Sequence, residues 1–137
     1  MQRTLALIKP DAYAAGHQGA IIARIQESGL KVIGLKVLHL TEAQAKGFYH
    51  VHAERPFFGD LVKFMTEGKI VAMVLEGDDA IKRWRDLMGP TDATKAEKGT
   101  IRGDFGTSIE RNASHGSDAV DTAAFEVGYY FAGLELA

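Results

Sequence analysis

Apolar residues recur along the chain with two spacings, one typical of helices and one typical of strands. Ile21, Ile22 and Ile25 have the helical spacing, and Gly29 follows them as a stop signal. The apolar run at 4–8 ends before Pro10 and predicts a buried strand. The expected elements are, in chain order, a strand over 4–8, a helix over 19–28, a strand over 31–40, a helical hairpin interrupted at 55–56 and resumed over 57–66, a strand over 69–75, a helix over 80–88, a short helix over 118–124 and a last strand over 125–132.

Local signals add detail to this pattern. Thr41 is followed three residues later by Gln44, which predicts a capping box at the start of the hairpin. Asp78 is expected to open the helix over 80–88. The segment 89–117 is rich in glycine and has little periodicity, and such a segment inside a compact domain is usually functional or disordered.

The order of the elements predicts an α+β fold. Two β-α-β halves that share an antiparallel sheet give the ferredoxin-like sandwich, a four-stranded sheet with helices covering one face. The halves show no sequence repeat, so this prediction depends on element order. One domain over 1–137 is expected, because a chain of 137 residues buries roughly two-thirds of its unfolded surface.

Composition and charge exclude several classes of function. Apolar residues make up 46% and charged residues 25% of the chain, which argues against disorder and against a coiled coil. The formal net charge of -2 predicts no general affinity for nucleic acid or for an anionic membrane. No apolar run approaches the roughly 20 residues of a membrane span, no export signal is recognised and there is no cysteine, so we expect a cytoplasmic protein without disulfides.

His115 is the residue best suited to chemistry. Imidazole titrates near neutrality and can attack an electrophile as the neutral base. Three arginines upstream, Arg85, Arg102 and Arg111, are able to neutralise a phosphate brought to it. Considered alone, a histidine beside glycine and serine is more often a loop residue than a catalyst, so these residues leave both interpretations open.

The segment Asn112-Ala113-Ser114-His115-Gly116-Ser117-Asp118 matches N-x-x-H-G-S-D, the active-site signature of the nucleoside diphosphate kinase family. The stretches at 4–11, 55–58, 89–91 and 99–105 agree with that family in order and spacing, so the chain resembles it over nearly its whole length. The resemblance implies transfer of the γ-phosphoryl group from a nucleoside triphosphate, such as ATP, to a nucleoside diphosphate. His115 would carry the group between the two in a ping-pong route.

The resemblance also implies roles around His115. Glu126, at the start of the expected last strand, would accept a hydrogen bond from one ring nitrogen and leave the other free to attack. Ser117 would hydrogen-bond Glu126, and Tyr49 would close the pocket. Without the motif, Glu126 would be interpreted as a solubilising charge on an edge strand and Ser117 as an ordinary helix cap.

The nucleotide phosphates and sugar have their own expected contacts. By resemblance, Arg85, Arg102 and Thr91 would hold the phosphates. Lys9 would reach the ribose and the γ-phosphate, and Asn112 would contact the ribose hydroxyl and His115. Arginine suits this work because its planar fork bonds two oxygens at once.

The base is expected to lie between apolar groups. Phe57 resembles the aromatic on which the family stacks the base, with Ile109 against the opposite face, whereas Phe58 is expected in the core. Stacking needs only a π-face, so little base specificity is expected. Arg83 and Arg111 are interpreted as surface arginines.

Magnesium is expected to arrive with the nucleotide phosphates, and Asp118 would touch it at most through water. His50 and His52 form an H-x-H, but no third ligand is nearby in sequence, which disfavours a structural zinc site. The resemblance further implies a homo-oligomer, a tetramer or a hexamer.

Two other functions remain open at this stage. A non-catalytic nucleotide-binding or regulatory module can use the same fold, although such a module needs no nucleophile at position 115. A nucleic-acid-binding protein that uses Phe57 is disfavoured by the net charge and by the acidic residues of the 89–117 segment.

Overall fold

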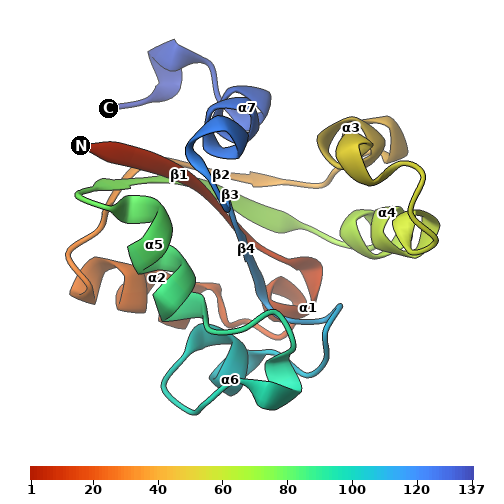
Figure 1. Ribbon diagram of the computed structural model, residues 1–137, viewed down its shortest axis with the longest axis horizontal. Helices are drawn as coiled ribbons and strands as arrows, with labels where there is room; N and C mark the ends of the chain where they lie inside the picture. Colours follow the sequence, from red (N-terminus) through yellow and green to blue (C-terminus); the bar gives the residue numbers. More distant parts are fainter.

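The computed structural model describes residues 1–137 as one antiparallel sheet with helices packed around it (Figure 1). The strand order is β2-β3-β1-β4. The elements are β1 (Gln2–Ile8), α1 (Pro10–Ala14), α2 (Gln18–Glu27), β2 (Lys31–Leu38), α3 (Glu42–Phe48), η1 (His50–His52), α4 (Phe58–Thr66), β3 (Ile70–Gly77), α5 (Ala80–Met88), η2 (Ala93–Lys95), α6 (Ile101–Phe105), β4 (Ser114–Gly116), α7 (Val120–Tyr130) and η3 (Gly133–Glu135). The predicted α+β class and four-stranded antiparallel sheet are confirmed.

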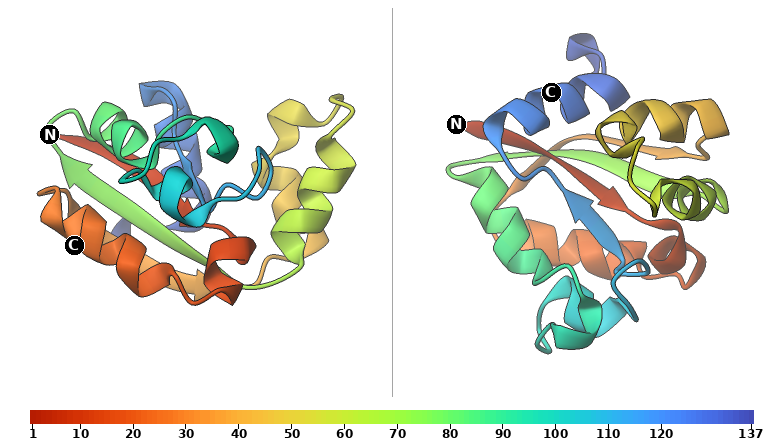
Figure 2. Two further views of the ribbon diagram at one scale, coloured as in Figure 1. Left: turned by 90° about the horizontal axis from the view of Figure 1, so that it is seen from below. Right: turned by 45° about the vertical axis from the view of Figure 1, so that its right-hand side comes forward.

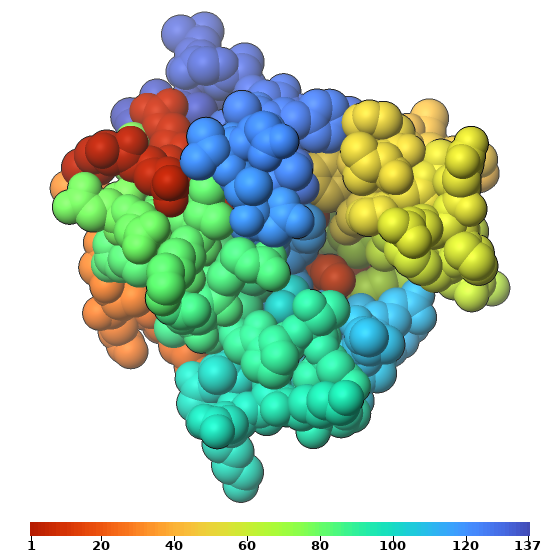
Figure 3. Space-filling view, in the orientation of Figure 1, coloured from red at the N-terminus to blue at the C-terminus, as the bar shows by residue number.

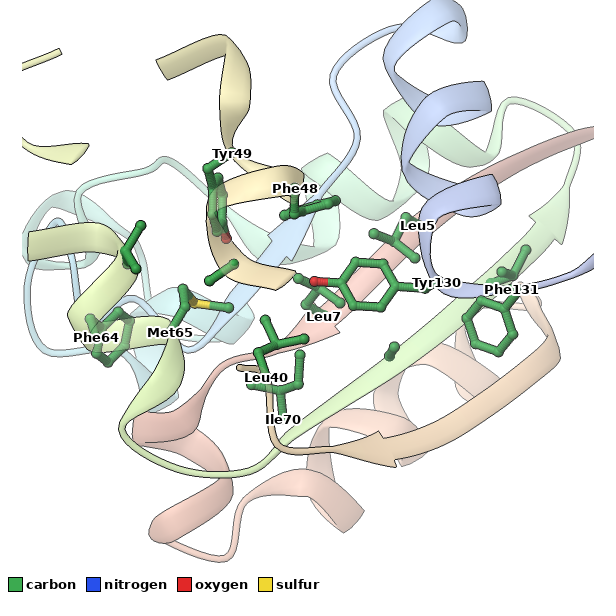
Figure 4. Packing of buried hydrophobic residues seen from close by; sticks show 14 residues of the cluster. Leu5, Leu7, Leu40, Phe48, Tyr49, Phe64, Met65, Ile70, Tyr130 and Phe131 are labelled. Atoms are coloured by element: carbon green, nitrogen blue, oxygen red, sulfur yellow. The ribbon is translucent and has the colours of Figure 1, made fainter. Parts of the chain in front are cut away.

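Helices cover both faces of the sheet, so the expectation of helices on one face is wrong (Figure 2). The inner strands β1 and β3 contain unbroken apolar runs at 5–8 and 70–75, and alternate residues of these runs therefore need cover on each side. Leu5 and Leu7 pack under α7, α3 and α4, in the cluster that Figure 4 shows. Ala6 and Ile8 point the other way, towards α2 and α5.

The C-terminal element is a helix, not the strand expected over 125–132. The alternation of apolar residues from Phe125 to Phe131 imitates a strand, but Ala123, Val127 and Tyr130 also have helical spacing, and this stripe packs against the sheet. The short helix expected over 118–124 is the first part of α7. The fourth strand is β4. It has three residues, too few to show an alternating pattern in the sequence.

The predicted bounds of β1, α2, β2, β3 and α5 hold within two residues, but the helix after Thr41 ends at Phe48 and not at the interruption expected at 55–56, because the chain passes into the 3-10 turn η1. The Thr41–Gln44 capping box is present, with both hydrogen bonds formed. Helix α5 follows Asp79 rather than Asp78, and neither carboxylate caps it; instead the Gln2 side chain accepts the Ile81 amide at 2.9 Å. The short helix α1 was not expected, and the 89–117 segment contains η2, α6 and β4. No helix is both long and apolar enough to cross a membrane.

Candidate active site

Strand β4 fixes the direction in which His115 points. It pairs with β1 so that His115 lies opposite Leu7, and paired residues share a face of the sheet. His115 therefore faces the α7 side, while Gly116 faces α5, where a Cβ would overlap the side chains of Trp84 and Met88. The Trp84 Nε1–H donates to the His115 carbonyl oxygen at 3.1 Å, which anchors the strand from that side.

The turn before β4 is held in a conformation that alanine rarely adopts. Ala113 has φ of +72°, which costs an L-residue roughly 1–2 kcal/mol. Its amide donates to Asp11 Oδ2 at 3.0 Å, and its carbonyl oxygen accepts the Lys9 amide at 2.8 Å. Asp11 thus supports the approach to His115, a role that the sequence interpretation missed although Asp11 stands within the 4–11 motif.

A hydrogen-bond chain joins His115 to helix α7. Its Nε2 lies 2.9 Å from Glu126 Oε1, and the Ser117 hydroxyl donates to the same oxygen at 2.8 Å. The His115 and Glu126 side chains are only 20% and 15% exposed. A proton on Nε2 satisfies the carboxylate and leaves the lone pair of Nδ1, which has no hydrogen-bond partner, available. Glu126 meets His115 from a helix, not from the strand expected.

Aromatic rings from the end of α3 enclose the imidazole. The Phe48 ring lies edge-on to His115 with a centroid distance of 5.5 Å, and Tyr49 lies at 6.5 Å. The Tyr49 hydroxyl is buried without a partner, and burial, followed by the charge of Glu126, raises its pKa. Figure 4 shows Phe48 and Tyr49 side by side at this end of the helix. The sequence interpretation named Tyr49 but missed Phe48, which carries no signal apart from its apolar character.

Lys9 and Arg102 are the only buried charged side chains, and neither forms an ion pair. The Lys9 ammonium donates to Asn112 Oδ1 at 2.8 Å. Burial, followed by the charge of Arg102, lowers the pKa of Lys9 to about 8. The Arg102 guanidinium donates to the carbonyl oxygens of Gly89 and Ser114 at 3.0 Å each, while its Nε has no partner.

Lys9, Arg102 and Arg85 bring positive charge close to β4 and form no ion pair. Burial lowers the pKa of Arg102 to about 10, and the next cause is the charge of Arg85. Arg85 is exposed and reaches the Gly116 carbonyl oxygen only at 3.5 Å. Unpaired cations gathered in this way have the charge to hold an anion, which would offset the cost of burying them.

Figure 3 shows a hollow between the yellow α3–α4 pair and the blue α7, with a red N-terminal part of the chain visible inside it. The remaining predicted nucleotide contacts are Thr91, Phe57 and Ile109. Thr91 is exposed, and its carbonyl oxygen accepts the Asn112 amide group at 2.9 Å. Phe57, just before α4, is 49% exposed, and Ile109 is 64% exposed. Phe58 is partly buried against the core.

Two further arginines, Arg111 and Arg83, contact other parts of the chain. Arg111 pairs with Glu67 at 2.8 Å and lies over the Phe64 ring, which ties the segment carrying Ile109 to α4. Arg83 donates to the carbonyl oxygens of Asp78 and Ser28. Arg111 is exposed, as expected of a surface arginine, whereas Arg83 is partly buried.

The side chains do not form a metal cage. No group of three or more histidines, cysteines or carboxylates is placed to hold an ion. Asp118 is exposed, accepts the Thr122 hydroxyl at 2.7 Å and lines the same shallow concavity as Arg85. A divalent ion here would need most of its ligands from another molecule.

Comparison with known proteins places this site in a family. The sequence profile described as nucleoside diphosphate kinase matches residues 2–136. The nucleoside diphosphate kinase of Syntrophotalea carbinolica is 64% identical over 136 residues, 99% of each chain. That of Desulfosudis oleivorans is 56% identical and covers 99% of this chain and 98% of its own.

Solved structures agree with the sequence matches. The Aquifex aeolicus nucleoside diphosphate kinase has a TM-score of 0.97 at 46% identity, covering 99% of both chains. The Halobacterium salinarum nucleoside diphosphate kinase, solved in complex with CDP, has a TM-score of 0.95 at 42% identity, covering 99% of this chain and 91% of that one. The profile match and these relatives extend over essentially the whole sequence, and the chain therefore belongs to the nucleoside diphosphate kinase family.

Proposed function

We propose that the protein moves the γ-phosphoryl group of a nucleoside triphosphate to a nucleoside diphosphate through a phosphohistidine at His115. The observation that carries this proposal is an imidazole bonded through Nε2 to Glu126, with Nδ1 free, beside two buried cations that have no ion-pair partner. Membership of the family supports the same reaction.

In the first half-reaction Nδ1 attacks the γ-phosphorus. The new P–N bond forms as the bond from phosphorus to the bridging oxygen breaks, and that oxygen keeps the electron pair in the departing diphosphate. The imidazole becomes cationic as it is phosphorylated, and the Glu126 carboxylate opposes this charge through the Nε2 proton. Ser117 holds the carboxylate oxygen in place.

In the second half-reaction an oxygen of the acceptor's terminal phosphate attacks the same phosphorus. The P–N bond breaks and its electron pair returns to Nδ1, so the imidazole is neutral again and ready for another cycle. A covalent intermediate of this type lets one pocket serve donor and acceptor in turn.

The cations stabilise the charge on the transferred group. The positive charge comes from Lys9, Arg102 and Arg85. Thr91 adds a hydroxyl donor, and Asn112 links Lys9 to the Thr91 backbone. Because these groups are largely in place before the nucleotide arrives, little reorganisation is needed during the reaction.

Phe57 and Ile109 are proposed to hold the base, and Tyr49 to close the pocket over His115. Both base contacts are exposed apolar side chains that offer no edge-reading hydrogen bond. A site strongly selective for one base must bond its edge, so weak discrimination among nucleotides is expected.

Magnesium fits this site as a companion of the nucleotide, with the phosphates as its main ligands and Asp118, one of the carboxylates beside Arg85, binding it at most through water. When bound it would neutralise phosphate charge.

We also expect one domain, a cytoplasmic location and assembly of several copies of the chain.

The decisive experiment is incubation with ATP labelled at the γ-phosphate, followed by denaturing electrophoresis. The parent should carry a label that is lost in acid and survives alkali, as expected of a phosphoramidate. His115→Ala should carry none, while His39→Ala, which alters an exposed histidine, should label normally. An acid-stable label would indicate an ester at Ser117, and nucleotide binding without any label would favour a non-catalytic module.

A further inference from the structure

A single side-chain hydrogen bond joins helix α3 to α7, beside the ring contacts that Phe48 makes with Tyr129 and Tyr130. The Tyr129 hydroxyl donates to the Gln44 carbonyl oxygen at 2.7 Å, across 85 positions of sequence. Tyr129 is 37% exposed, so its ring covers the outside of this junction. Helix α3 leads through η1 into α4, and this hairpin carries Tyr49 and Phe57.

The ring of Phe48 contacts both Tyr129 and His115 and so connects the junction to the imidazole. Phe48 lies 5.6 Å from Tyr129 and 5.5 Å from His115, measured between ring centroids. Glu126 precedes Tyr129 by three residues on α7, so the two project from neighbouring positions of one helix face. The position of α3 relative to α7 therefore sets how Phe48 packs against an imidazole that Glu126 holds from the other side.

Gly47 provides a second, independent sign that this contact is built into the chain. A Cβ at this position would overlap the Tyr129 hydroxyl. Glycine inside a helix is less favourable than alanine by conformational entropy, so its presence in α3 needs a reason. The close approach of the tyrosine hydroxyl supplies one.

We propose that Tyr129 is a positioning residue for the transfer reaction, holding the α3–α4 hairpin at the separation from α7 at which Phe48 and Tyr49 wall the imidazole and Phe57 meets the base. It touches no reacting atom and acts through Phe48 and the hairpin. This inference rests on the proposed function, because its consequence is a change in nucleotide handling.

The first test removes only the hydroxyl, with Tyr129→Phe. Without nucleotide, amides of 42–48 should exchange with deuterium about twofold to tenfold faster, as expected for the loss of one hydrogen bond. The KM for nucleoside diphosphates should rise by a similar factor with kcat changed less than about twofold, since bound nucleotide restores the packing. The matched control is Tyr13→Phe, whose hydroxyl makes no hydrogen bond in the structure and whose loss should change neither quantity.

The second test is a double-mutant cycle that combines Gly47→Ala with Tyr129→Phe. Alone, this change should displace the tyrosine and raise KM as Tyr129→Phe does. In the Tyr129→Phe background it should add less than about twofold, because the overlapping atom is gone. Multiplicative effects would overturn the proposal, as would unchanged exchange and KM in Tyr129→Phe. Loss of global stability alone would leave KM unaltered below the unfolding temperature. If the parent shows no transfer, the proposed function fails, while deuterium exchange still decides whether Tyr129 holds α3.

Discussion

Replacement of Lys9 by methionine tests the claim that its buried charge is kept for binding rather than for stability. The pKa of Lys9 falls from 10.5 to about 8, and at 1.36 kcal/mol per unit the charged form opposes folding by on the order of 3 kcal/mol. Methionine removes this cost but leaves Asn112 Oδ1 without its donor, which costs about 1–3 kcal/mol. Near pH 7 we therefore expect Lys9→Met without nucleotide to be as stable as the parent, or more stable by up to about 2 kcal/mol.

The pH dependence gives the sharper test. Between the folded pKa near 8 and the unfolded value of 10.5, the unfolded chain binds more protons at Lys9 than the folded one, so stability from this group rises with pH. Other groups cancel when parent and variant are compared. From about pH 7.5 to about pH 9.5 the parent should gain roughly 2 kcal/mol relative to Lys9→Met.

Urea unfolding of both proteins across this pH range measures the difference directly. Lys31→Met, which alters an exposed lysine without an ion pair, should give a flat difference. The KM of Lys9→Met for nucleotides should rise about tenfold to a hundredfold, the equivalent of one lost charge-assisted hydrogen bond. A flat difference between parent and Lys9→Met would refute the argument, and unchanged KM would remove Lys9 from the phosphate site.

Substitutions at three further positions test other parts of the site. Glu126→Gln should lower kcat by roughly tenfold to a hundredfold without abolishing transfer, because the nucleophile remains while its orientation is weakened; equal rates from about pH 6 to 9 would contradict this role. Phe57→Ala should weaken all four common nucleoside diphosphates in parallel by roughly 1–3 kcal/mol, and competition assays in which one base is affected alone would reveal a contact with a base edge. Asp11→Ala should destabilise the protein by about 1–3 kcal/mol in denaturant unfolding and slow transfer, because the Ala113 amide loses its acceptor. Asp11→Asn keeps an oxygen at this position and should recover much of both, and failure of that recovery would assign the effect to the carboxylate charge.

The sequence was sufficient for the inner part of the fold. Strands β1 and β3 contain continuous apolar runs, and α2, α4 and α5 have clear helical spacing, so these elements lie within a few residues of their predicted positions. The C-terminal element could not be assigned by pattern, because Phe125 to Phe131 alternate as a strand would while the helical stripe of α7 is narrow. Only the contact of that stripe with the sheet decides between them.

The site shows the same division. The motifs brought His115, Lys9 and Asn112 to attention from opposite ends of the chain, and the structure places all three in one hydrogen-bonded neighbourhood. Phe48 had no distinguishing signal, since its place beside the imidazole depends on how α3 docks. The contact between Tyr129 and Gln44 is equally invisible, because it joins a side chain to a backbone atom 85 positions away.

Polar groups that lack a hydrogen-bond partner gather near the candidate site, beside the most apolar strands of the sheet. Seven buried side-chain polar atoms have no partner, and four of them belong to Asp11, Tyr49, Arg102 and Ser114, at or beside the candidate site. Two unpaired buried cations and the positive φ of Ala113 lie in the same region. Each feature opposes folding, and such features persist only where the surrounding structure enforces them. Strands β1 and β3, buried on both faces between two apolar clusters, hold these features in place. Lys9 directly follows β1, and β4 pairs with β1. The unpaired cations therefore lie against the part of the sheet that is buried on both faces, where the cost of their charge can be offset until an anionic ligand arrives.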